Sequence, residues 1–195
     1  MSWSFAVTTP PTFECLSVNE VKARLQFDGT DEDAVIAMVL AAAREQFEGD
    51  VGRSLVTQTL TLTSDRFPYS STSPMFLPRP PIQSITHVKY YDADGVQQTW
   101  GASNYQFDLV RYPSRLMPAY NVTWPTTRSQ MNAVEIRYVA GFASPPLVPD
   151  RQKQAICLLV GQMLENREAL APIDLKVVPF AYEHLTAALR NWDFG

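Results

Sequence analysis

The stretch LPRPPIQSITHVKYYDADG, residues 77–95, constrains the fold more than any other part of the sequence. Residues 85–91 and 95–100 are two β-prone runs, and the turn residues 92–95, Asp-Ala-Asp-Gly, separate them. Asp-Gly between two such runs is typical of a tight β-hairpin, because the turn needs backbone angles that glycine adopts without strain. We therefore expect antiparallel strands in the middle of the chain.

The prolines in front of this hairpin have two interpretations. Pro78, Pro80 and Pro81 flank Arg79 and could form a polyproline ligand for another protein. Proline also fixes φ and moves the preceding residue toward extended backbone, so the same residues predict a rigid lead-in to a strand at Ile82. We favour the lead-in.

Other segments of the middle region also have the alternating pattern of half-buried strands. Residues 57–63, TQTLTLT, place leucines on one face and threonines on the other, and residues 105–108 predict a further short strand. Residues 134–138, VEIRY, place their apolar side chains inward and Glu135 and Arg137 outward. These runs predict antiparallel strands.

The strands together predict a β region over about residues 55–140. Residues 64–75 and 110–132 are rich in Pro, Ser and Thr, and we expect long connections there. Connections of that length are usually functional or mobile.

The flanks of the β region have helical patterns. Residues 17–20, Ser-Val-Asn-Glu, form a capping box that predicts a short helix to about Leu25. Residues 34–47 predict a second helix, and residues 150–168 predict a third that spans about 27 Å at 1.5 Å per residue. The helical segments are therefore expected at about residues 17–52 and 150–168.

The second of these helices carries two apolar stripes. Together they cover most of its circumference, which predicts a central helix whose apolar surface needs more partners than a small monomeric bundle offers. The stripes are Val35, Met38, Val39 and Ala42, and Ile36, Leu40, Ala43 and Phe47.

The composition limits the class of protein. The 195 residues fit one domain, and 46% hydrophobic with 18% charged residues excludes a largely disordered chain. The net charge of −4 argues against a general nucleic-acid-binding surface. Cys15 and Cys157 are read as reduced thiols of a protein made in the cytoplasm. We expect a soluble protein without a membrane span or leader.

Motifs for catalysis or cofactor binding are missing from the sequence. A calcium-binding loop that began at Asp92 would need glycine at position 97 and glutamate at position 103, where the sequence has Gln97 and Ser103. The turn interpretation is therefore preferred. His87 and His184 have no recognisable metal-ligand spacing with the cysteines, and we expect no metal and no cofactor. A small cytoplasmic hydrolase or a peptide-binding module stays an alternative, favoured by a pocket around either histidine.

The end of the chain has a candidate partner surface. Residues 171–178 read as an extended arm, and the following helix places four apolar side chains on one face. Such a face can dock on a partner or pack within its own subunit, and both interpretations remain open. The four residues are Tyr182, Leu185, Leu189 and Trp192.

Five segments in order resemble the tailed-phage head–tail connector, or adaptor, family, over about residues 16–170. The last segment, residues 171–195, matches the family pattern least well. The matching segments are LSVNEVKARL, DGTDEDAVIAMVLAAAREQFEGDVGRSLVTQTLTL, LPRPPIQSITHVKYYDADG, VEIRYVAGF and VPDRQKQAICLLVGQMLENREA.

The resemblance implies a non-enzymatic virion protein of the neck, between capsid and tail. Family members form a ring, usually a dodecamer, that docks under the portal, extends the channel for passing DNA and presents a surface to a stopper or tail-completion protein. The C-terminal segment commonly contacts the portal. The implied fold is a single α+β domain, residues 1–195: a small helical bundle with an inserted antiparallel β region and long loops. A stopper or tail-completion protein of the same neck is the alternative.

Overall fold

The computed structural model describes residues 3–109, 113–165 and 180–190. The chain divides into two compact units. We call residues 1–12 and 57–141 the β unit, and residues 13–56 and 142–193 the helical unit. The inserted strands and the flanking helices thus form separate cores.

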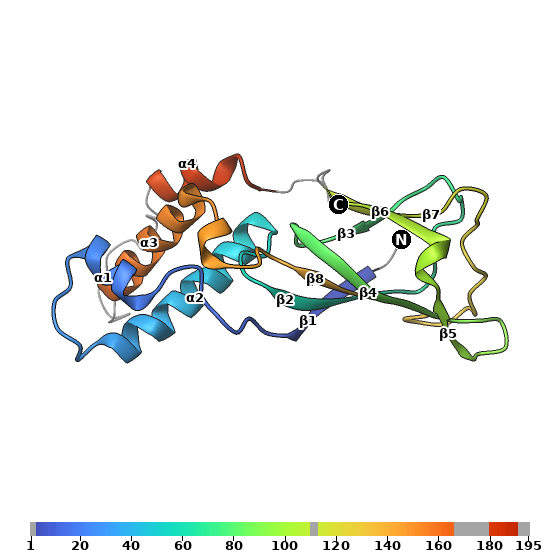
Figure 1. Ribbon diagram of the computed structural model, residues 1–195, viewed down its shortest axis with the longest axis horizontal. Coiled ribbons are helices and arrows are strands. Elements are labelled where there is room, and N and C mark those ends of the chain that lie inside the picture. Colours follow the sequence, from blue (N-terminus) through green and yellow to red (C-terminus); the bar gives the residue numbers. More distant parts are fainter. Residues whose placement is uncertain (1–2, 110–112, 166–179, 191–195) are drawn as a thin grey trace, which may run out of the picture. The chain divides into compact units, whose positions relative to one another are not determined.

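Within the described residues, the helical unit contains four α-helices and one short 3-10 helix (Figure 1). The helix α1 begins with the expected capping box, in which the Ser17 hydroxyl accepts from the Glu20 backbone N–H and Glu20 bonds back to Ser17 N at 2.7 Å. This prediction is confirmed. The elements are α1 (Val18–Leu25), α2 (Asp33–Val51), η2 (Pro145–Leu147), α3 (Asp150–Glu165) and α4 (Phe180–Ala187).

The helix α2 buries only one of its two apolar stripes. Ile36, Leu40 and Phe47 are buried in the helical core, but Val35 is 38% exposed and Met38 is 67% exposed. This exposed stripe agrees with the expectation that α2 has more apolar surface than one small helical bundle covers. Within a single copy, α2 keeps apolar surface available for a partner.

The β unit contains two antiparallel sheets (Figure 1). The five-stranded sheet has the order β1-β2-β8-β4-β5, and the three-stranded sheet has the order β3-β7-β6, next to the 3-10 helix η1 (Ala102–Asn104). The strands are β1 (Trp3–Thr9), β2 (Gln58–Ser64), β3 (Met75–Leu77), β4 (Ile82–Tyr91), β5 (Gln97–Trp100), β6 (Tyr105–Asp108), β7 (Ser114–Pro118) and β8 (Val134–Ala140).

The predicted hairpin is confirmed. Strands β4 and β5 pair antiparallel around the turn, where Asp92 N donates to Val96 O at 3.0 Å and Asp92 Oδ1 accepts from the N–H groups of Asp94 and Val96. Gly95 has a φ of 83°, the left-handed conformation that the turn needs. Strand β4 also begins at Ile82, directly after the prolines, as the lead-in interpretation expects.

The predicted strand alternation is confirmed as well. Leu60 and Leu62 of β2 are buried, as are Val134, Ile136 and Tyr138 of β8. These side chains share one core in the β unit. The intervening residues of both strands are buried less.

The predicted fold class is wrong in its emphasis on a small helical bundle. Both helices and strands are present, but the described residues form eight strands in two sheets, so the fold is sheet-rich. Strands β1, β3 and β7 lie in segments that the sequence pattern left as loops or unassigned. Each is fixed by pairing with a distant segment, as in the match of Phe5 to Leu62 and of Met75 to Leu116. Such long-range pairing overrides weak local propensity.

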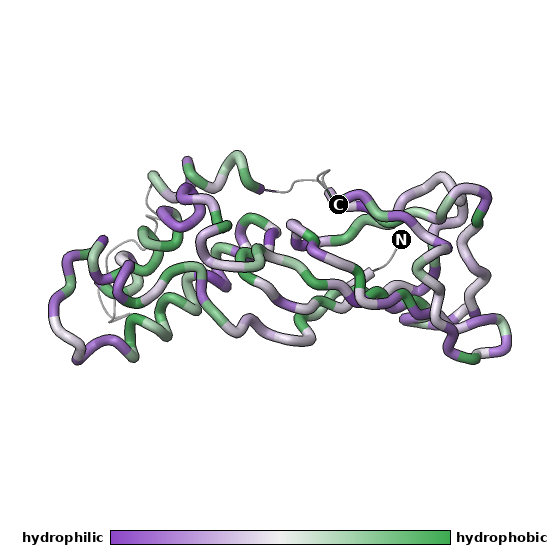
Figure 2. The backbone as a smooth tube through the Cα atoms, viewed as in Figure 1, coloured by the Kyte–Doolittle hydropathy of each residue, from purple (hydrophilic) through white to green (hydrophobic). Residues whose placement is uncertain are grey.

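Hydrophobic and hydrophilic residues interleave along the elements (Figure 2). Among the described residues, no helix is long and apolar enough to cross a membrane. The prediction of a single domain over residues 1–195 stays a prediction.

Candidate functional site

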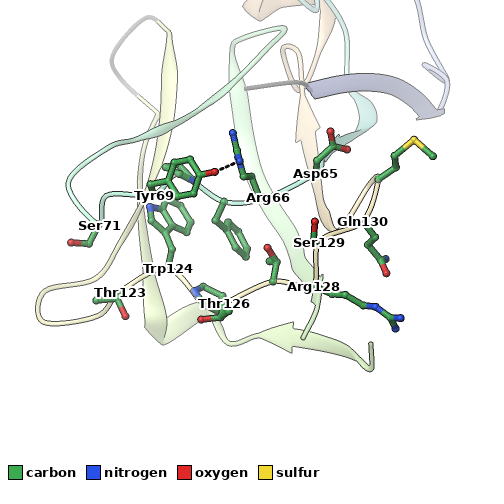
Figure 3. A pocket seen from close by; sticks show the side chains of 15 residues that line it. Asp65, Arg66, Tyr69, Ser71, Thr123, Trp124, Thr126, Arg128, Ser129 and Gln130 are labelled. Atoms are coloured by element: carbon green, nitrogen blue, oxygen red, sulfur yellow. Dashed lines mark hydrogen bonds between the residues drawn. The ribbon is translucent and has the colours of Figure 1, made fainter. Parts of the chain in front are cut away.

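A groove with a volume of about 930 Å³ lies in the β unit (Figure 3). Two segments line it: residues 65–71, which follow β2, and residues 123–131, which lie between β7 and β8. Both belong to the Pro-, Ser- and Thr-rich connections in which the sequence predicted function or mobility. The groove is therefore the main candidate for a binding site on this unit.

Aromatic side chains form the floor of the groove. Phe67 stacks on Trp124 with ring centroids 4.9 Å apart, and its ring also contacts Tyr90 and Trp100. Trp100 in turn contacts Tyr105 at 5.5 Å. The rings come from loops and from both sheets, so their packing connects the groove to the apolar core of the β unit.

Two arginines lie at the edges of the groove (Figure 3). The Arg66 guanidinium lies 4.2 Å from the centre of the Tyr69 ring and donates to the Tyr69 hydroxyl. Both Arg66 and Arg128 are exposed, and neither forms an ion pair with another described residue. The arginines therefore offer positive charge to a partner above an aromatic surface.

Backbone hydrogen bonds fix the second wall against the sheet. Arg128 N donates to Tyr91 O at 3.0 Å, and Tyr91 N donates to Ala133 O at 2.9 Å. Asp65 Oδ1 accepts from Asn132 N at 3.0 Å, which joins the two lining segments. Asp65 is the acidic residue of the lining, and this bond engages its carboxylate.

The polar side chains of the groove can form hydrogen bonds with a partner, and both histidines lie outside its lining. Its lining includes hydroxyl and amide side chains, but neither His87 nor His184. His87 lies on β4 with Nε2 2.8 Å from Glu135 Oε1, and His184 is exposed on α4. A pocket around either histidine would favour the hydrolase alternative, and this groove contains neither of them.

The two cysteines are buried thiols of the helical unit. Burial, with the nearby Glu14 carboxylate, raises the pKa of Cys15 to about 12. Burial also raises the pKa of Cys157. A thiolate nucleophile is therefore disfavoured at both positions. Among the described residues, no three His, Cys, Asp or Glu side chains are grouped to hold a metal ion.

The predicted partner face on the last helix lies partly within its own unit. Tyr182 is buried, its hydroxyl donates to Asp50 Oδ2 at 2.7 Å, and its ring meets Phe47 edge-to-face. Burial, and next Asp50, raise the pKa of Tyr182. Leu185 and Leu189 are partly buried against the same core. Trp192 lies outside the described residues, so the four-residue face stays a prediction.

Sequence reasoning missed the groove because its residues are far apart in the chain. The signals available were two long connections and the aromatic residues within them, Phe67, Tyr69 and Trp124. Local patterns do not show that these segments meet. The pairing of β3 with β7 and of β2 with β8 brings them together.

The chain belongs to the head completion protein family, whose model matches residues 14–166. The comparison with curated proteins found no match. Among solved structures, the chain is similar to one in the neck of an empty gene transfer agent particle computed with C6 symmetry. The identity is 25%, the TM-score is 0.75, and the likeness covers 98% of this chain and 96% of that chain.

Two further structures are similar over nearly the whole chain. One is in the virion of a native gene transfer agent particle, with 26% identity, a TM-score of 0.75 and coverage of 96% of this chain and 95% of that chain. The other is in the neck of a native particle computed with C12 symmetry, with 24% identity, a TM-score of 0.73 and coverage of 98% and 96%. The last of these likenesses concerns the fold alone.

Proposed function

We propose that this head completion protein is the head–tail adaptor in the neck of a tailed-phage-like particle. In this role it forms a ring under the portal, extends the DNA channel and joins the capsid to the stopper or tail-completion protein. The observation that carries the proposal is the family match over residues 14–166, together with likeness to a neck chain over 98% of this chain. Its expected place is the virion neck.

Ring formation is supported by the symmetries of the similar particles, C6 and C12. These make a dodecamer on the portal the expected assembly. A cyclic ring needs two different surfaces on each copy, because its contacts are heterologous. The exposed stripe of α2 and the groove of the β unit are two such surfaces, on different units of the chain.

A structural role also agrees with the electrostatics. The net charge of −4 suits a channel component, since a strongly basic bore would hold the passing DNA. DNA is accordingly proposed as cargo that passes through the ring. A non-enzymatic protein without cofactor or metal stays our prediction.

The alternative within the same neck is a stopper or tail-completion protein. Binding distinguishes the two, because an adaptor binds the portal directly and a stopper binds the adaptor ring. Native mass spectrometry of the full chain mixed with the portal of its own particle measures this. A complex with twelve copies per portal supports the adaptor, whereas no binding to the portal with binding to a preassembled neck ring supports the stopper. The major capsid protein serves as the control for nonspecific association.

A further inference from the structure

The two units of the chain carry opposite net charge. Residues 1–12 and 57–141 hold seven Lys and Arg against five Asp and Glu, a net charge of +2. The rest of the chain holds nine Lys and Arg against fifteen Asp and Glu, a net charge of −6, and the two values sum to the −4 of the whole chain. The positively charged β unit of one copy is therefore electrostatically complementary to the negatively charged helical unit of a second copy.

The positive charge of the β unit has a specific site in the groove. Arg66 and Arg128 lack acidic partners among the described residues, and they flank an aromatic floor of Phe67 and Trp124. Arginine and aromatic residues are the types that dominate binding energy in protein interfaces. A guanidinium binds a carboxylate in a bidentate manner, so the groove fits an acidic protein segment.

The helical unit has an acidic segment in the loop between α1 and α2. Residues 28–33, DGTDED, contain four carboxylates. Asp33 Oδ1 is paired with Lys22 Nζ at 2.7 Å, and Lys22 also donates to Gly29 O, so the loop is fixed at its base. Asp28 and Asp31 are exposed, and neither forms an ion pair with another described residue. These two carboxylates are available to a partner.

We infer that the acidic loop of one copy, residues 28–33, docks in the Arg66 and Arg128 groove of a second copy. This inference rests on the proposed ring and deepens it by naming a subunit contact. The contact joins two different surfaces, as a closed ring of identical subunits requires. It involves exposed charges and is therefore weakened by salt.

Reciprocal charge reversal in the full chain tests this contact. The groove variant carries Arg66→Glu and Arg128→Glu, the loop variant carries Asp28→Lys and Asp31→Lys, and a third variant carries all four changes. Native mass spectrometry at low ionic strength and high protein concentration, with and without portal, measures the assembly. Each two-residue variant is expected to lose the ring, and the four-residue variant is expected to regain it.

A matched control changes the same number of charges elsewhere. Arg151→Glu with Lys153→Glu also shifts the net charge by −4, and neither residue lines the groove. This control is expected to assemble as the unchanged protein does. Far-ultraviolet circular dichroism and melting temperature confirm that each variant is folded, since all the reversed residues of the groove and loop are exposed.

A cross-link identifies the second copy directly. Asp31→Cys in one copy and Ser129→Cys in another are expected to form an intermolecular disulfide in a mixture, while Cys15 and Cys157 are buried. If the groove variant or the loop variant forms rings on the portal as completely as the unchanged protein does, the inferred contact is wrong. The proposed adaptor function is not affected by that result. Failure of the unchanged chain to form a ring in solution and on the portal would overturn both.

Discussion

The Arg128 side chain packs against the backbone of Gly95, in the turn between β4 and β5, and leaves no room for a Cβ atom there. One glycine therefore serves two purposes. It supplies the positive φ that the hairpin needs, and it allows Arg128 to lie over the turn at the edge of the groove. The most evident turn signal of the sequence is thus linked to the candidate binding site.

Replacement of Gly95 by alanine is expected to lower the free energy of unfolding by about 1–2 kcal/mol, because the left-handed backbone disfavours a Cβ. The change also displaces Arg128. Chemical denaturation measures the loss. Gly49→Ala is the matched control, since Gly49 lies in α2 with nothing within 4 Å of an added Cβ, and it is expected to stabilise by up to about 1 kcal/mol. Equal effects of the two changes would contradict this account of Gly95.

The buried ion pairs of Arg44 predict a large stability effect in the helical unit. Arg44 Nε donates to Glu14 Oε2 at 2.8 Å, and Arg44 also pairs with the buried Glu48, which accepts from Leu55 N at 2.6 Å. Arg44→Ala leaves carboxylates without their cation and is expected to cost about 3–5 kcal/mol. Arg24→Ala, at an exposed position, is expected to change stability by no more than about 0.5 kcal/mol. Thermal unfolding of both variants tests the contrast, which a small effect at Arg44 would refute.

Tyr182 separates the two interpretations of the last helix. Because its ring is buried against Phe47, Tyr182→Ala is expected to lower stability by about 3–5 kcal/mol, as for other large-to-small changes of aromatic residues. Tyr182→Phe removes only the hydrogen bond to Asp50 and is expected to cost about 1 kcal/mol. Unfolding curves measure both variants. An unchanged melting temperature for Tyr182→Ala would favour a helix that only serves a partner.

The partner role predicted for the less buried positions has its own readout. Leu185→Ala and Leu189→Ala are expected to weaken portal binding, because we propose that this face contacts the portal. Native mass spectrometry of the folded variants with portal measures the change. Portal binding equal to that of the unchanged chain would mean that these leucines serve only the packing of the helical core.

Cys15 predicts a pH effect at alkaline pH. Its pKa is raised to about 12 in the folded protein from the ordinary value of 9.0, mainly by burial. Between these values the unfolded chain releases the thiol proton and the folded chain keeps it, so stability falls as pH rises, by up to about 1.4 kcal/mol per pH unit. Below pH 9 this contribution is fully present. Cys15→Ala is expected to remove this part of the slope in denaturation curves from pH 8 to 11, and an identical slope in both proteins would contradict the assignment.

The features that were predictable from sequence are those encoded by near neighbours in the chain. The capping box at Ser17, the turn at Gly95 and the alternation of β8 each depend on contacts within a few residues, or on one buried face. Strand β3 has only three residues and lies in a proline-rich segment, so its pairing with β7 has no local signal. The groove depends on that pairing and could not be found from single segments.

The exposure of Met38 shows a second limit of pattern reasoning. Two apolar stripes cover most of the circumference of α2, yet only the stripe with Ile36 and Leu40 is buried in the subunit. A protein that assembles with partners uses the same apolar residue types at its interfaces as in its own core. Periodicity therefore marks apolar faces without indicating which of them another chain covers.

Electron microscopy of the full chain bound to the portal of its own particle tests the adaptor function most directly. The account predicts a closed ring of twelve copies directly under the portal, coaxial with the channel, with the β unit of each copy next to the loop of residues 28–33 of a neighbour. Portal rings that stay bare, while the same chain binds a later component of the neck, would contradict it.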